Sequence, residues 1–464
     1  MRLELWVIAV LVVLASTTAS QAAKPTYNIE QAVGLAQAQN SEIAIARKNI
    51  EAARGDLVAA RAGFLPAVIS TGLIDKREHQ QQTSLRDEDY STSLRLLQNL
   101  YTGGAVTSQV AIARLNIEKQ DLQFQEITNR VVMEVRIAFN DLLLNRAKVR
   151  VREDSVRVLE EELKSQEERL NAGIVGTLNV RRAEVALANE RPELINAQTQ
   201  LKNSYLRLGE LCGIDFQSDV EGAPFEISGQ LQYRPRHPDL NECLGRAEAN
   251  RPEIKAREKD VQIQDRQYTL EQSELRPQVQ FFSGYEVYNE RDPAVGQEFN
   301  HGYLVGINAN WHVFDGFATK GRLQATRARR EAAVQALEAA RRGVAAEVRS
   351  AFADLDQATR VLETETKNVQ TADESLEIAK TNLGAGLGTQ LDILQAASDV
   401  TRTRTTRLSA IYLHNVALAR LARACANQPD ALDVEPKVKN VSKKKSGETR
   451  AADVARPPKK LTVR

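Results

Sequence analysis

Cysteine, histidine, proline and aromatic residues are all scarce in this sequence. It has 3 cysteines, 5 histidines and 13 prolines in 464 residues, and only 5% of its residues are aromatic. The histidines include no pair at the spacing of metal ligands, and the sequence has no phosphate-binding loop and no nucleophile motif. We therefore reject an enzyme and expect no catalytic residue, no cofactor and no bound metal.

The three cysteines are Cys212, Cys243 and Cys425, and this odd number does not fit the disulfide framework of an exported protein. Cys212 and Cys425 lie 213 positions apart, which is the period of an internal repeat described below. We interpret them as buried small apolar residues at equivalent places of that repeat. The sequence still leaves one disulfide open.

Long apolar runs are absent after the N-terminus. Residues 1–22 have the pattern of a secretory signal peptide, with Arg2, an apolar run and then small residues up to a cleavage site after Ala22. No later stretch approaches the ~20 consecutive apolar residues of a transmembrane helix. We expect an exported chain whose mature form has no transmembrane helix.

Charge is unevenly distributed along the chain, although the formal net charge is only +1. Residues 437–464 carry ten Lys or Arg against two acidic residues, so the preceding part of the chain is acidic. We expect residues 426–464 to be a basic, disordered tail. Nucleic-acid binding is disfavoured because the body of the chain is acidic and the tail has no interleaved aromatics.

The chain is organised around a proline-free stretch, residues 105–170, that predicts one helix of roughly 100 Å at ~1.5 Å per residue. Apolar residues recur every seven positions along it, as in a coiled coil. The same seam occurs again 213 positions later. Its members are Val135, Leu142, Val149, Val156, Leu163 and Leu170, then Val348, Leu355, Leu362, Val369, Leu376 and Leu383. We infer a duplication, with a first repeat over residues 23–212, a linker over 213–239 and a second repeat over 240–425.

Each repeat has the same predicted order of elements: a helix, two strands, a long helix and a returning helix. The first helices are expected over residues 29–62 and 240–275, and the returning helices over 178–208 and 391–424. The long and returning helices form two αα-hairpins. The turns from strand to helix contain Gly103, Gly104, Asp315 and Gly316.

The second pair of strands, residues 279–287 and 303–313, alternates apolar with polar or small residues and places Tyr303 and Trp311 towards its ends. That pattern is typical of lipid-facing strands in an outer-membrane β-barrel. The first pair, residues 67–75 and 90–100, has a weaker pattern, and an ordinary soluble hairpin is the alternative. Four strands cannot close a barrel, so a membrane-inserted chain must pool its strands in an oligomer.

With these features the chain resembles the TolC-like outer membrane efflux protein family over residues 27–425. The resemblance rests on the duplicated order of elements, on Asn250 to Ile254, on Phe314-Asp315-Gly316 and on Ala385 to Ile393. It implies a mixed membrane α/β fold and a homotrimer whose twelve-stranded outer-membrane barrel continues as an α-helical tunnel through the periplasm. The implied function is the exit duct of a tripartite efflux pump or a type I secretion system.

The resemblance also implies two sites. A periplasmic adaptor, which links the duct to an inner-membrane transporter, would contact the hairpin tips, which are Ala172, Gly173, Ile174, Ala385, Gly386 and Leu387. The tunnel would narrow nearby at Asp392, followed one turn later by Gln395, with Asn179 equivalent to Asp392 in the first repeat. Three copies of Asp392 would form an anionic ring that attracts cations. The alternative role of Asp392 is a carboxylate at a helix N-terminus.

A second function remains in view, an elongated coiled-coil scaffold of the cell envelope that conducts nothing. The strands with Tyr303 and Trp311 argue against it, because a periplasmic scaffold does not need a lipid-facing sheet. Within the channel interpretation, the sequence does not distinguish drugs, metals and polypeptides as cargo.

Overall fold

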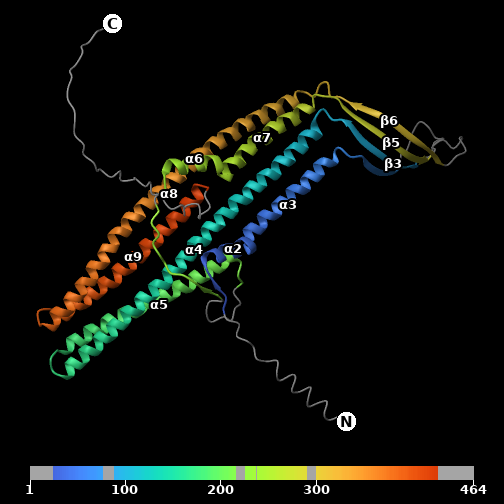
Figure 1. Ribbon diagram of the computed structural model, residues 1–464. Helices are drawn as coiled ribbons and strands as arrows, with labels where there is room; N and C mark the ends of the chain where they lie inside the picture. The colour runs from blue at the N-terminus through green and yellow to red at the C-terminus, as the bar shows by residue number, and fades with distance from the viewer. Residues whose placement is uncertain (1–23, 77–87, 216–224, 237, 290–298, 427–464) are drawn as a thin grey trace, which may run out of the picture.

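The structure is a computed structural model that describes residues 24–76, 88–215, 225–236, 238–289 and 299–426. The expected signal peptide and nearly all of the expected basic tail lie outside these residues. The described chain is elongated, with a β-sheet at one end and two helical hairpin tips at the other (Figure 1).

Two long helical hairpins make up most of the molecule. They consist of α4 (Ala105–Asn171) with α5 (Thr177–Cys212), and α8 (Ala318–Gly384) with α9 (Gln390–Ala424). The hairpins lie side by side through α4 and α9 (Figure 1). The predicted seam packs inside them: Val135 and Leu142 of α4 and Val348 of α8 are fully buried. Burial of the seam decreases towards the tips, where Leu163 and Leu376 are half-buried.

The helix that precedes each pair of strands is broken in two, so our prediction of single helices over 29–62 and 240–275 is wrong. The pieces are α2 (Ile29–Gln39) and α3 (Ser41–Ala62), then α6 (Leu240–Asn250) and α7 (Pro252–Ser273). Asn40 ends α2 and caps α3, because its side chain accepts from the Glu42 and Ile43 amides and donates to the Leu211 carbonyl at 2.9 Å. Pro252 occupies the first position of α7, where its missing N–H costs nothing.

One antiparallel sheet combines strands from both halves in the order β2-β3-β5-β6. Its members are β2 (Ala67–Lys76), β3 (Glu88–Tyr101), β5 (Gln278–Asn289) and β6 (Phe299–Asn310). Leu97 of β3 opposes Phe282 of β5, and this central pairing joins the two halves. The predicted limits of the last strand are wrong: β6 begins four residues before Tyr303 and ends before Trp311. Pairing with β5 extends it to Phe299, and the chain leaves the sheet after Asn310 to turn into α8.

The linker carries a short strand that the sequence did not predict. In it, β4 (Glu226–Ile227) pairs in parallel with β1 (Thr26–Tyr27) near the start of the described chain. Phe225 lies beside the rings of Tyr27 and Tyr205, at 6.0 and 5.5 Å between centroids. These contacts bring the linker back onto the first repeat.

Two equivalent apolar clusters lie in the middle of the molecule, one in each repeat. The first contains Leu208 and Cys212 at the end of α5, and the second contains Leu421 and Cys425 at the end of α9. All three cysteines are buried and none forms a disulfide. Burial raises the pKa of the Cys212 thiol to about 11, which keeps it neutral in the folded chain.

Candidate functional site at the hairpin tips and the sheet

The two hairpins turn in the same way. Gly173 and Gly386 occupy the left-handed region with φ of 73° and 75°, a conformation that glycine adopts without steric cost. The residue after each glycine donates its backbone N–H back into the preceding helix, at 2.9 Å in both turns. Repeats that diverge in sequence therefore keep one turn geometry.

Apolar side chains project from both turns. Ile174 is 72% exposed and Leu387 is 83% exposed, and each follows the turn glycine. Ala172 and Ala385 cap the ends of α4 and α8 without adding bulk beside them. The six residues predicted for adaptor contact thus lie at the ends of the two hairpins, three at each turn.

The returning helices begin differently. Thr389 and Asp392 form a capping box at the start of α9: the Asp392 carboxylate accepts from the Thr389 backbone N–H and hydroxyl, both at 2.8 Å. The bond from the Thr389 backbone holds the pKa of Asp392 below its ordinary value. In the first repeat Gly176 stands at the equivalent position and offers no side-chain cap. Asp392 therefore has the helix-terminal role that we gave as its alternative, and its side chain is exposed.

The first turn of α9 also contacts α5 directly. Gln390, whose side chain is nearly inaccessible at 5% exposure, donates from Nε2 to the Asn179 carbonyl at 3.1 Å. Asn179 is thus brought to the start of α9, whereas Gln395 bonds within its own helix, to Asp399 at 3.5 Å. The sequence analysis did not identify Gln390, since its partner lies 211 residues away.

Two further polar contacts link the hairpins at successive levels above the tips. Thr401 donates to the Ser155 hydroxyl at 3.2 Å, and Asn415 donates to the Asn140 side-chain oxygen at 2.9 Å. Together with Gln390, they connect α9 to the first hairpin at three heights. These bonds are directional, so they fix the register between the two hairpins.

The two faces of the sheet differ in polarity, one being more apolar than the other. On the apolar face Tyr303 is 91% exposed, and Val305 and Ile307 are exposed beyond it along β6. The opposite face carries polar pairs that bridge neighbouring strands. These are Arg95 with Glu286 at 3.3 Å, Thr71 with Ser93 at 2.7 Å and Gln280 with Asn99 at 3.2 Å. Strands of an outer-membrane barrel have this division, apolar towards lipid and polar towards the lumen.

Exposed aromatic residues cluster where the sheet meets the helices. Trp311 follows β6 and donates its indole N–H to the Leu275 carbonyl at 3.1 Å. Phe314, which the sequence analysis used only as part of the turn motif, and Phe317, which it did not select, are exposed, and their rings are in edge contact at 5.4 Å between centroids. Aromatic side chains at the end of a lipid-facing face are typical of a membrane–water interface. Tyr303 lies in the middle of β6 and is outside this cluster.

The strand-to-helix turns rely on left-handed backbone at Gly103, Gly104 and Gly316, with φ of 63°, 100° and 66°. A Cβ on Gly103 would lie 2.7 Å from the Ser273 carbonyl oxygen, so no other residue fits there. Asp315 accepts from the Thr319 backbone N–H at 2.7 Å, and its hydrogen bonds to Thr319 lower its pKa.

Among the residues that the structure describes, no group of three or more His, Cys, Asp or Glu side chains could hold a metal ion. Within the same residues, every helix is too short or too polar to cross a membrane.

Comparison with known sequences finds a match to the profile named outer membrane efflux protein, over residues 32–214 and 243–427. The chain is 28% identical over 217 residues to the alkaline protease secretion protein AprF of Pseudomonas aeruginosa, which covers 45% of this chain and 44% of AprF. It is 24% identical over 183 residues to the proteases secretion protein PrtF of Dickeya chrysanthemi, covering 39% of this chain and 40% of PrtF. The chain thus aligns with less than half of either relative.

Comparison with solved structures finds the same fold over a larger part of the chain. The outer-membrane channel OprN superposes with a TM-score of 0.73 at 18% identity, covering 86% of this chain and 90% of OprN.

Proposed function

Because the chain belongs to the outer membrane efflux protein family, whose profile spans both of its repeats, we propose that it is the outer-membrane exit duct of a secretion or efflux machine. The family places the chain in the outer membrane, with its helices extending into the periplasm. In the proposed homotrimer, each copy contributes four strands to a twelve-stranded barrel. The hairpins continue the barrel as an α-helical tunnel.

The observation that carries this function is a sheet with two unpaired edges and one exposed apolar face. Within the described chain β2 and β6 each have a neighbour on one side only. Unpaired backbone groups are not tolerated in hydrocarbon, so lipid insertion requires the edges to meet those of other copies. A non-conducting scaffold, the rival function, gives no reason for the exposed face with Tyr303, Val305 and Ile307.

The tips support a docking role for the opposite end. Ile174 and Leu387 present apolar surface on rigid glycine turns, and six such tips would surround the entrance of a trimer. A periplasmic adaptor that covers these side chains would remove them from water. The inner-membrane transporter would then be connected to the duct through the adaptor.

The start of α9 supports a narrow, openable entrance. Three Asp392 carboxylates would form an anionic ring, and the Gln390 bond to Asn179 would hold the second hairpin against the first. Opening requires the hairpins to move apart there, which breaks this bond. The charge of the entrance would thus come from Asp392, and the contact that holds the hairpins together would come from Gln390 and Asn179.

The names of the two relatives favour polypeptides as the cargo. AprF and PrtF are both named for the secretion of proteases. We accordingly place this chain in a type I secretion system ahead of a drug or metal efflux pump.

The assembly is tested by expressing the full chain in a Gram-negative host and fractionating the envelope. Light scattering, corrected for detergent, should give three times the protomer mass for protein extracted from the outer membrane, and planar bilayers should show discrete conductance steps. A soluble periplasmic monomer or dimer would reject the duct and leave the scaffold.

Cargo is tested separately, in a strain that has the transporter and adaptor of a protease secretion system but has lost its outer-membrane component. Restored proteolytic activity in the medium supports polypeptide export. Restored resistance to small toxic compounds in a matching efflux strain, without protease export, would support the efflux pump instead.

A further inference from the structure

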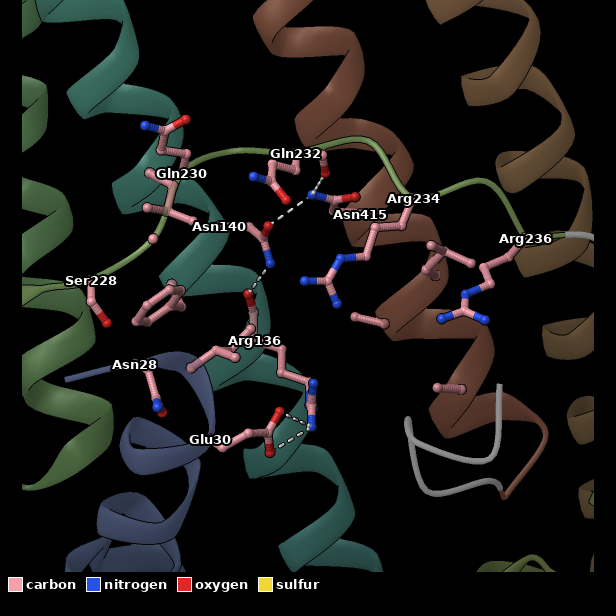
Figure 2. A pocket seen from close by; sticks show the side chains of 17 residues that line it. Asn28, Glu30, Arg136, Asn140, Ser228, Gln230, Gln232, Arg234, Arg236 and Asn415 are labelled. Carbon is pink, nitrogen blue, oxygen red and sulfur yellow. Dashed lines mark hydrogen bonds and ion pairs between the residues drawn. The ribbon is translucent and has the colours of Figure 1, made fainter. Parts of the chain in front are cut away.

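A pocket of about 370 Å³, lined by both polar and apolar side chains, lies halfway along the molecule, away from both the sheet and the tips. It is formed by α2, α4 and α9 together with residues 228–236 of the linker, which cross from α4 to α9 as an extended segment (Figure 2). We call residues 228–236 the strap. The duct function uses neither the strap nor its pocket.

The strap is held at its start and at its middle. On α4, Arg146 donates to the carbonyls of Ile227 and Gly229. On α9, Asn415 donates to the Gln232 carbonyl at 3.2 Å, and the ring of Tyr233 lies edge-on to His414 at 4.7 Å between centroids. Fixed at these points, the strap is a defined surface rather than a loose loop.

Alternate residues of the strap face different ways, as in any extended chain. Leu231 packs against the apolar clusters and Tyr233 against His414. The residues between and beside them line the pocket, and they are Gln230, Gln232, Arg234 and Arg236. Figure 2 shows Arg234 pointing back from the strap towards Arg136 of α4.

Positive charge is in excess in the pocket. Its lining holds the guanidinium groups of Arg136, Arg234 and Arg236 and a single carboxylate, Glu30, which pairs with Arg136 at 3.1 Å. Arg236 has an interaction of its own, so the uncompensated charge is that of Arg234. Among the described residues, no carboxylate forms an ion pair with Arg234. An oxyanion is the ligand that would complement this charge, and a guanidinium binds a carboxylate in a fork with two parallel hydrogen bonds.

Groups that bind a peptide backbone adjoin these arginines. The backbone N–H groups of residues 230–234 donate to no acceptor in the described chain. An extended segment with unpaired N–H groups can pair with another extended chain, and the side-chain amides of Gln230 and Gln232 each offer a donor and an acceptor for further peptide groups.

We propose that the strap binds an extended acidic peptide segment of a periplasmic partner, which pairs with its backbone and places carboxylates at Arg234 and Arg136. Charge and backbone geometry recognise different features of the peptide. The arginines select acidic side chains, and the extended strap selects a chain over a small anion.

The test uses the purified full-length protein in detergent and a fluorescein-labelled octapeptide of alternating threonine and glutamate, measured by anisotropy at low salt. We expect saturable binding that weakens as salt is added, and at least tenfold weaker binding of the same peptide with glutamine in place of glutamate. Arg234→Gln should weaken binding at least fivefold. Arg207→Gln removes an exposed arginine on α5 outside the pocket and should leave binding unchanged.

Light scattering and thermal melting establish that both variants keep the assembly and fold of the parent protein. N-acetylglutamate, which carries carboxylates without an extended chain, should displace the peptide only at far higher concentration. Equal binding of the glutamate and glutamine peptides, equal loss in the two variants, or efficient displacement by N-acetylglutamate would each overturn the assignment.

Discussion

Gln390 and Asn179 are 211 residues apart in sequence and are joined by one hydrogen bond, from the Gln390 side-chain amide to the Asn179 carbonyl at 3.1 Å. The bond ties the first turns of the two returning helices together at the narrow end of the proposed tunnel. The Gln390 end of the bond is buried and the Asn179 end is half-buried, so the bond is only partly shielded from water.

Gln390→Ala should loosen the entrance, since it removes the donor and leaves the Asn179 carbonyl without it. We expect a higher single-channel conductance, or more frequent opening, in planar bilayers. Gln370→Ala is the matched control, because Gln370 is exposed on α8 and donates to Glu374 of the same helix at 3.0 Å. Identical conductance of the two variants would show that the contact does not restrain opening.

Asp392 has two roles that separate variants can distinguish. Asp392→Asn keeps an oxygen that accepts from Thr389 but removes the charge, whereas Asp392→Ala removes both. Both variants should reduce cation preference in bilayer measurements, and only the alanine variant should also lower the melting temperature. A cation preference unchanged in both would place the carboxylate outside the conduction path.

The pH dependence of Asp392 follows from its lowered pKa. A carboxyl group with a folded pKa below its unfolded value contributes stability above the unfolded pKa and loses it as pH falls through the folded pKa. Cation preference should therefore persist as pH is lowered to about 4, the ordinary aspartate pKa, and decline only below it. Reversal potentials in a salt gradient, recorded from pH 7 to 3, measure this.

A buried ion network holds α7, α8 and α9 together. Arg251, with only 4% of its side chain exposed, donates to Glu347 at 2.5 Å and to the Arg423 carbonyl at 3.0 Å. Glu347→Gln should cost about 2 kcal/mol of unfolding free energy, because it weakens charged hydrogen bonds from Arg251 and Arg423, which keep Glu253 and Glu126 as their other partners. Glu338→Gln breaks an exposed pair on the same helix and should cost less than about 1 kcal/mol. Chemical denaturation compares the two.

Gly103 and Gly316 share a left-handed backbone but differ in the space around them. A Cβ at Gly316 meets nothing within 4 Å, so Gly316→Ala should cost only the conformational term of about 1 kcal/mol. Gly103→Ala adds a clash with the Ser273 carbonyl oxygen and should lower the melting temperature clearly more. Equal decreases in melting temperature for the two variants would mean that the backbone near Ser273 moves to make room for the new Cβ.

Cys212 should make stability depend on alkaline pH. Its folded pKa of about 11 exceeds the unfolded value of about 8.5, so its contribution is complete below the unfolded value and is lost as pH rises through the folded one. Cys212→Ala should therefore lose less stability than the parent between pH 8.5 and 11. The melting temperatures of both proteins are measured across that pH range. The difference between them cancels the contribution of the other titrating groups, which the two proteins share.

Patterns that repeat locally were readable from the sequence. The heptad seam of Val135 and Leu142, and the turns at Gly173 and Gly386, follow from periodicity and from the backbone freedom of glycine. The sheet was predicted from alternation, but the limits of β6 were not, because pairing with β5 decides where Phe299 joins it.

Features that depend on distant partners could not be predicted. Asn40 breaks a helix whose spacing continues past it, since its side chain finds the Leu211 carbonyl 171 residues away. The two-residue pairing of β1 with β4 is too short to leave a pattern. Gln390 has no local mark either, because its partner is the Asn179 carbonyl of the other repeat.

The unpaired edges of β2 and β6 also set the kinetics of assembly. A chain that completes its own sheet folds at a rate independent of how many copies surround it. In the proposed homotrimer the step that buries the edges needs other chains, so its rate would rise with their local concentration. Until neighbours arrive, each exported chain must hold its apolar face outside the lipid, and the supply of partners rather than the chain's own folding then limits how quickly ducts appear.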